Sequence, residues 1–253
     1  NAYNQVFPKL PNSLEKIKVG YAYNQVFPKL PNSLKSLYFQ FSYYYANNFN
    51  QILDLPDSLE ELILAERYNQ MLENLPKSLK KIRLGDDYNH ILTNLPEGLE
   101  EICLGKNYDQ PLPELPQSLK QLSIGENYNQ PLPELPQSLK KLYIGNNYNQ
   151  PLPKLSQLLK QLIIGENYNQ ILRLPNNLKS LNIFSDSYDL EVKLPSQLKN
   201  LFCSSSYFLK NLHNSKASQL KIITYNAIEL HNDIKFCMNY YNLTNVETIN
   251  AYK

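Results

Sequence analysis

A tyrosine followed by asparagine or aspartate recurs every twenty residues through the middle of the chain. A fixed period of this length is typical of a solenoid, in which each unit buries its apolar side chains only against its neighbours. The repeat therefore decides the fold class before any single residue is considered. The regular copies stand at Tyr68, Tyr88, Tyr108, Tyr128, Tyr148 and Tyr168.

Leucines divide the chain into the same units, because each unit carries the pattern Leu-x-x-Leu/Ile-x-Ile/Leu/Val. Two looser copies follow the regular ones, so we expect about twelve units. Residues 1–219 form the repeat region, with an insertion at 40–48, and residues 220–253 hold irregular last repeats and a C-terminal cap. The units begin at Leu14, Leu34, Leu59, Leu79, Leu99, Leu119, Leu139, Leu159, Leu178 and Leu198, and the looser copies at Leu220 and Leu243.

The sequence of each unit predicts one short strand, followed by an extended segment that leads back to the start of the next strand. In residues 119–124, Leu122 and Ile124 alternate with polar side chains, which is typical of a half-buried strand. Residues 131–136 contain three prolines, and proline lacks the donor that a helix interior needs. The predicted fold is a leucine-rich-repeat solenoid with a parallel β-sheet on its concave face and an extended, non-helical convex face.

The cores "YNQPLP" at 128 and 148, "FNQIL" at 49 and "YNQIL" at 168 resemble the FNIP repeats of social amoebae and giant DNA viruses. The resemblance covers residues 1 to about 200, although tyrosine mostly replaces the family's phenylalanine and the units are shorter. A second resemblance is to bacterial effector leucine-rich repeats, through "LPELPQSLKQL", but those lack the Tyr-Asn pair. FNIP chains often carry an F-box. The resemblance therefore implies that the repeats could recruit substrates for a ubiquitin ligase.

Two asparagine columns flank the tyrosine, and they differ in what they accept. The column before it includes Arg67, Asp87 and Ser187, so we expect it to face solvent. The column after it accepts only asparagine and aspartate, which predicts a buried side chain hydrogen-bonded to turn backbone. The tyrosine rings should stack into a spine along the solenoid. Each hydroxyl should reach either the rim of the solenoid or a carbonyl group. The predicted structural ladder is Asn4, Asn24, Asn50, Asn69, Asn89, Asp109, Asn129, Asn149, Asn169 and Asp189.

Three departures from the repeat are candidates for function. The insertion carries three adjacent tyrosines, which suit a contact surface. A basic row flanks the C-terminal strands, where it either keeps an edge solvated or attracts an acidic partner. Residues 227–246 have helical apolar spacing and predict an amphipathic helix in a C-terminal cap. Asn1 enters a unit with no cap, which suggests that this end is covered either by preceding residues or by a second chain in an end-to-end homodimer. The basic row is Lys120, Lys140, Lys160, Lys179 and Lys199.

Composition and motifs favour a binding protein over an enzyme. The net charge is +2, so the balance of charges gives no general attraction to nucleic acid or to an anionic membrane. The sequence has no apolar run of transmembrane length, no zinc-ligand spacing and no phosphate-binding glycine loop, so we expect no cofactor or metal. Cys103 should lie between Arg83 and Ser123 without a catalytic base. An odd number of cysteines favours an intracellular, cytoplasmic setting.

The leading hypothesis is a non-enzymatic scaffold that binds a protein partner on the concave sheet face or through the insertion. The alternatives are the repeat region of a ubiquitin ligase or effector whose catalytic domain lies elsewhere, and a self-associating structural protein. The hypothesis rests on outward strand positions that are apolar, aromatic or basic. The predicted partner-binding residues are Lys18, Tyr38, Tyr43, Tyr44, Tyr45, Ile63, Arg83, Ser123, Tyr143, Ile163 and Phe202.

Overall fold

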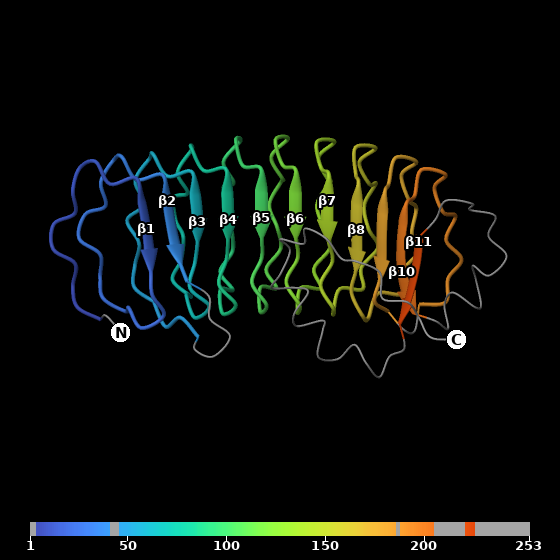
Figure 1. Cartoon of the computed structure of the whole chain (residues 1–253), viewed down its shortest axis with the longest axis horizontal. Coiled ribbons are helices and arrows are strands. Elements are labelled where there is room, and N and C mark those ends of the chain that lie inside the picture. The colour runs from blue at the N-terminus through green and yellow to red at the C-terminus, as the bar shows by residue number, and fades with distance from the viewer. Residues whose placement is uncertain (1–3, 41–45, 186–187, 205–220, 226–253) are drawn as a thin grey trace.

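A single parallel sheet runs the length of the molecule (Figure 1). The computed structural model describes residues 4–40, 46–185, 188–204 and 221–225, and these residues contain eleven strands and no helix. Neighbouring strands in the sheet are also neighbours in the sequence. The strands are β1 (Lys16–Val19), β2 (Ser36–Phe39), β3 (Glu61–Ile63), β4 (Lys81–Arg83), β5 (Glu101–Cys103), β6 (Gln121–Ser123), β7 (Lys141–Tyr143), β8 (Gln161–Ile164), β9 (Ser180–Ile183), β10 (Asn200–Ser204) and β11 (Lys221–Tyr225).

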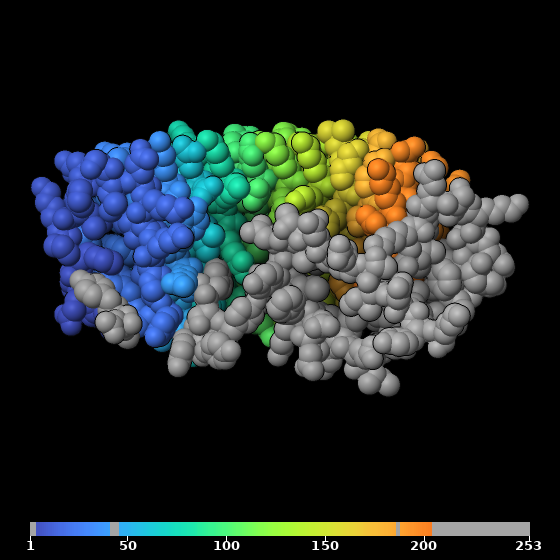
Figure 2. All heavy atoms as spheres, viewed as in Figure 1, coloured from blue at the N-terminus to red at the C-terminus, as the bar shows by residue number. Residues whose placement is uncertain are grey.

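The predicted solenoid and its non-helical convex side are confirmed within the described residues. Figure 2 shows the described units stacked as an elongated body from the blue N-terminal end to the orange end. The count of twelve units is not confirmed, because only eleven strands lie in these ranges. The unit expected at Leu243, the helical cap in 227–246 and Tyr43, Tyr44 and Tyr45 lie outside the described residues.

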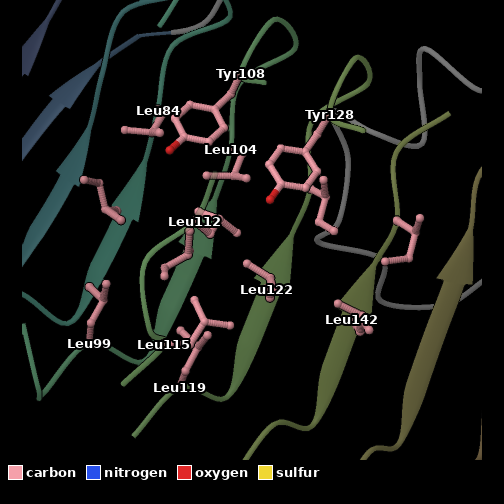
Figure 3. Packing of buried hydrophobic residues seen from close by; sticks show 14 of the residues in the cluster. Leu84, Leu99, Leu104, Tyr108, Leu112, Leu115, Leu119, Leu122, Tyr128 and Leu142 are labelled. Carbon is pink, nitrogen blue, oxygen red and sulfur yellow. The ribbon is translucent and has the colours of Figure 1, made fainter. Parts of the chain in front are cut away.

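The core lies between the sheet and the extended return segments. Leu112, Leu115 and Leu119 pack toward the strand side chain Leu122 (Figure 3). Leu119 and Leu122 are fully buried, as the alternation in residues 119–124 predicts, although the strand itself covers only residues 121–123. Each leucine finds its partners in its own unit and the two adjacent units, so no unit could bury its core alone.

The spine of aromatic rings is confirmed. From Tyr23 through Phe49 to Tyr188, successive rings stack with centroids 6.0–6.4 Å apart and planes within 19° of parallel. Parallel strands lie only about 4.8 Å apart. The units therefore splay on the spine side, and the sheet lies on the inner, concave side.

The expectation that the spine hydroxyls reach a backbone group is confirmed for Tyr23, Tyr128 and Tyr188, which each donate to a backbone carbonyl at 3.3–3.5 Å. The other five hydroxyls are buried and form no hydrogen bond of regular geometry with a described residue. In four of these five units, burial raises the pKa of the tyrosine, and a weaker backbone hydrogen bond with a return-segment leucine lowers it. The five are Tyr68, Tyr88, Tyr108, Tyr148 and Tyr168, and all except Tyr68 have the weaker bond.

The second asparagine column holds the turn backbone, as predicted. The backbone N–H of Asn149 donates to Oδ1 of Asn129 at 2.9 Å, and the N–H of Asn129 donates to Oδ1 of Asp109 at 2.9 Å. The same bond, at 2.9–3.2 Å, links every consecutive pair of ladder residues from Asn4 to Asn169.

The prediction that this column is buried is wrong, because its residues are exposed or half-buried. The column stands at the rim of the turn, where one face of each amide bonds the next unit and the other face meets water. A glutamine side chain adds a second bond to the same acceptor in several units, as Gln70 does to Asn50 at 3.3 Å. The restriction to asparagine and aspartate thus reflects hydrogen-bond geometry without burial.

The first asparagine column forms a second ladder that the sequence did not reveal. Nδ2 of Asn127 donates to Oδ1 of Asn107 at 2.9 Å, and Nδ2 of Asn147 donates to Oδ1 of Asn127 at 2.9 Å. These bonds join side chain to side chain, so they leave the backbone unaffected. At the turn before each strand, Ser138 similarly donates its hydroxyl to the carbonyl of Leu119 at 2.6 Å.

The insertion rejoins the repeat at Asn47, which is fully buried. In regular units the tyrosine N–H donates to the carbonyl three residues earlier, as Tyr128 does to Gly125 at 3.4 Å. Here the N–H of Phe49 instead donates to Oδ1 of Asn47 at 3.2 Å. A side chain therefore replaces the backbone acceptor that the insertion displaces.

Candidate interaction surface

The register of the sheet brings one outward side chain from each of the strands β1 to β10 into a continuous row, called here the central row. All of the predicted partner-binding residues within the described strands lie in it, while the three insertion tyrosines lie outside the described residues. The role of both sets of residues in binding stays a prediction. The central row is Lys18, Tyr38, Ile63, Arg83, Cys103, Ser123, Tyr143, Ile163, Asn182 and Phe202.

A polar network holds Tyr38 in place near the N-terminal end of the central row. Nζ of Lys16 lies 4.8 Å from the centre of the Tyr38 ring, and the Tyr38 hydroxyl donates to the carboxylate of Glu61. Nζ of Lys81 lies 4.0 Å from Glu61 and 3.3 Å from Glu101. The network fixes the half-buried ring of Tyr38 before any partner binds. The side chain therefore loses less conformational entropy when a partner packs against it.

The C-terminal part of the central row is closed off. Tyr143 and Ile163 are only 5% and 4% exposed, so the expectation that they stand free on the sheet is wrong. They form an apolar cluster with Phe184 and Phe202, whose ring centroids are 5.3 Å apart. Burial raises the pKa of Tyr143 to about 12, and the charge of Glu101 adds to this.

Sequence reasoning missed Phe184 because it belongs to no column. The turn after β9 is one residue longer than the turn after β8, and Phe184 is the additional residue. The N–H of Tyr188 donates to the carbonyl of Ser185 at 3.4 Å, so Ser185 takes the position that glycine holds in other units. The signal was the length of residues 184–187 against 165–167.

Cys103 occupies the centre of the row between Arg83 and Ser123, as expected. Burial raises the pKa of its thiol, and this outweighs the opposite effect of the Arg83 charge. The thiol is therefore protonated at neutral pH, which does not suit a nucleophile. No group of three or more metal-ligating side chains occurs within the residues described.

A second line of side chains beside the strands alternates in charge. Lys35 pairs with Glu15 at 3.6 Å, and Lys80 and Lys120 each pair with a glutamate of the preceding unit at 2.6 Å. From Lys140 to Lys199 no glutamate interrupts the line. The sequence indicated both the lysine row and the glutamates that hold the matching place in earlier units, such as Glu60 and Glu100. The acidic partner remains a prediction.

The unit built by these ladders and this spine matches a known repeat. The model of the FNIP repeat matches residues 3–42, 49–87, 88–127, 113–147 and 128–156. The chain belongs to the FNIP repeat family. Its aromatic-asparagine pair, stacked as a spine beside a ladder, is therefore the structural signature of these FNIP units.

The FNIP chain is similar to leucine-rich-repeat proteins of known structure. One is CroV588, described as a novel circular leucine-rich-repeat protein, with 30% identity over 86% of this chain and a TM-score of 0.69. This chain spans 38% of that protein's length. Another is YopM from Yersinia enterocolitica, with 22% identity, 77% and 56% coverage of the two chains and a TM-score of 0.47. No curated protein matches the chain.

The described part of the chain contains no helix that is long and apolar enough to cross a membrane.

Proposed function

We propose that this FNIP chain is a non-enzymatic scaffold that binds a protein partner across the concave sheet face. The observation that carries the proposal is the central row, which lines up basic, aromatic and aliphatic side chains that the core does not require. Aromatic and arginine side chains dominate the energetics of protein interfaces. The repeat fold is typical of interaction scaffolds and supports the same reading.

The partner should contact the β1–β6 half of the face. Tyr38, Ile63 and Ser123 are half-buried and Lys18 is exposed, whereas Tyr143 and Ile163 are almost fully buried. Lys18 and Arg83 bring positive charge on either side of Tyr38 and Ile63. A partner with an apolar segment flanked by acidic residues would match this chemistry.

The test is affinity capture with the purified chain, followed by measurement of the captured partner's dissociation constant. The variant carries Tyr38→Ser and Ile63→Asp, which remove the aromatic and aliphatic contacts without touching the core. We expect the dissociation constant to rise at least tenfold, since hot-spot side chains at interfaces each contribute about 2 kcal/mol or more.

The matched control is Lys77→Glu, a change at an exposed residue in the turn that precedes β4, outside the central row. It should leave the dissociation constant unchanged within twofold. Equal affinity of the concave-face variant and the wild type would refute the proposal. The ubiquitin-ligase and end-to-end dimer alternatives stay predictions.

A further inference from the structure

The charged line of side chains beside the strands changes character in the last four units. From Lys35 to Lys199, the backbone N–H of each member donates to the carbonyl of the member one unit earlier at 2.7–2.9 Å, so the line keeps strict register through the stack. Its earlier members alternate in sign and form three glutamate–lysine pairs. The last four members form no ion pair among the described residues, although one of them, Lys179, donates to Oε1 of Gln197 at 2.8 Å. These four are Lys140, Lys160, Lys179 and Lys199.

A second set of cations stands across the same turns. Its three members each lie six residues before one of these lysines, and all three are exposed. No acidic side chain lies between the two sets in any of the three units, whereas Glu114 and Glu134 hold the matching place in the two preceding units. Together the two sets form the basic edge, which consists of Lys140, Lys160, Lys179 and Lys199 beside the strands and Lys154, Arg173 and Lys193 on the return segments.

The fold does not require a basic edge. Neighbouring strands lie about 4.8 Å apart, and like charges directly opposite each other destabilise a sheet. The earlier units avoid this repulsion, because each lysine of the line pairs with a glutamate of the preceding unit at 2.6–3.6 Å. Alternating charges would keep the last units equally well solvated. The four unpaired lysines therefore lack a carboxylate that only another molecule can supply.

We propose that the basic edge binds an extended acidic segment of a partner polypeptide, which lies along the solenoid axis. Four lysines in register span three strand spacings, or about 14 Å. Side chains on one face of an extended chain recur about every 6.7 Å, so three acidic residues at alternate positions cover the same length. Each carboxylate would then make the charge-assisted bond that the glutamates of the earlier units already make.

Two features favour a polypeptide over a nucleic acid. Exposed side-chain amides line the turns between the two sets of cations, at Gln137, Gln157 and Asn176, and an amide can pair with both the N–H and the carbonyl of a peptide backbone. Acidic side chains begin at the N-terminal end of the edge, at Glu134 and Glu100. A nucleic acid is charged at every nucleotide and would run into them, whereas the acidic segment of a protein can end there.

The experiment measures the binding of a fluorescein-labelled peptide to the whole chain by fluorescence anisotropy at low ionic strength. The peptide alternates glutamate with serine, and the reference peptide carries glutamine in place of glutamate. We expect the glutamate peptide to bind at least tenfold more tightly than the reference, and its affinity to fall as salt is added. Equal affinity of the two peptides overturns the proposal. Tighter binding of a short oligothymidine at the same salt also overturns it.

Lys160→Glu restores the alternation of charge to the last four units, because Lys140 and Lys179 then each face a glutamate. It should weaken peptide binding at least tenfold, while the urea midpoint should not fall, since like-charge repulsion is replaced by ion pairs. The matched control is Lys77→Glu, which makes the same change of charge in an exposed turn outside the basic edge. The control should leave the dissociation constant within twofold. Unchanged affinity of Lys160→Glu overturns the proposal, and so does an equal loss in both variants.

This inference goes beyond the proposed function, because no residue of the basic edge belongs to the central row. The variant with Tyr38→Ser and Ile63→Asp should therefore bind the peptide as tightly as the wild type does. A loss of peptide binding in that variant would place the peptide on the concave face and overturn the assignment to the basic edge.

Discussion

The two asparagines that flank each spine tyrosine perform different tasks. Oδ1 of Asn129 accepts a backbone N–H from the following unit, so its loss removes a constraint on the main chain. Among the described residues, the side chain of Asn127 exchanges hydrogen bonds with the side-chain amides of Asn107 and Asn147. Two residues of identical chemistry thus differ in whether their side chains hold the backbone.

Asn129→Ala should therefore destabilise the chain more than Asn127→Ala. The first change leaves the N–H of Asn149 without its acceptor and should lower the free energy of unfolding by about 1 kcal/mol. The second breaks bonds between exposed side chains and should cost less than about 0.5 kcal/mol. Urea unfolding of both variants provides the comparison. A larger loss for Asn127→Ala would contradict the assignment of the backbone role.

Asn47 is the residue on which the insertion depends. Oδ1 accepts from Phe49, while Nδ2 lies 3.4 Å from the carbonyls of both Gly20 and Gln40. The side chain is fully buried, so no water can replace these partners.

Asn47→Ala should lower the free energy of unfolding by about 2–3 kcal/mol, because it orphans a buried N–H and opens a small cavity. Its neighbour Asn48 is exposed, so Asn48→Ala should have little effect and serves as the control. Thermal or urea unfolding measures both. Equal stability of the two variants would show that the insertion does not need this side chain.

At the scale of the element, the turn after each strand depends on how closely two backbones approach. A Cβ added at Gly125 would lie 1.8 Å from the carbonyl oxygen of Gly105. A Cβ at Gly20 would meet nothing within 4 Å. Ala65 holds this position in the unit that follows the insertion.

Gly125→Ala should cost about 3 kcal/mol, because the carbonyl it strikes belongs to a fixed backbone. Gly20→Ala should change stability by less than about 0.5 kcal/mol. The free energies of unfolding of the two variants test whether the close approach of the neighbouring turn's backbone is the reason for glycine at position 125. Similar losses at both positions would instead indicate a requirement for glycine's conformational freedom.

Much of the element structure could be predicted from columns of the repeat. A column restricted to asparagine and aspartate identified the ladder, and a column of aromatics identified the spine. The exposure of the ladder residues could not be predicted in the same way. Hydrogen-bond geometry, and not burial, restricts that column to asparagine and aspartate. The contribution of Phe184 to the apolar cluster was missed, because an inserted residue has no counterpart in the other units. The exposure of Val26, Ile52 and Met71, which align in the sequence, was also missed.

At the scale of the molecule, the small net charge conceals a division along the solenoid. Residues 51–135 carry fifteen acidic and seven basic side chains, and residues 136–204 carry four acidic and eight basic ones. A charged partner approaching the sheet would meet a field that changes sign along the axis, which orients it before contact. The same division favours one direction of binding along the concave face.

The tyrosine spine makes the whole molecule sensitive to alkali. Burial raises the pKa of Tyr128, Tyr148 and Tyr188 to about 12, from the ordinary value of 10.0. Between these values the folded chain retains protons that the unfolded chain releases. The free energy of unfolding therefore falls as pH rises through this range, and it is unaffected by these groups below pH 10.

We expect the urea midpoint to stay constant from pH 8 to about 9.5 and to fall steeply between about pH 10 and 12, in line with the ionisation of the unfolded chain. Absorbance at the tyrosinate band should show the spine residues titrating only as the chain unfolds. Reversible titration of every tyrosine in a chain that remains folded would contradict this expectation.

The stacked spine also gives the chain an optical property. The sequence contains no tryptophan, so its near-ultraviolet absorbance and emission are dominated by tyrosine. Rings held parallel at 6.0–6.4 Å couple their electronic transitions, and excitation absorbed by one ring can migrate along the column before it is emitted. Emission from the folded chain should remain polarised, because the excitation moves between rigidly held rings that are close to parallel. A fall in that polarisation would report the separation of units without any added label.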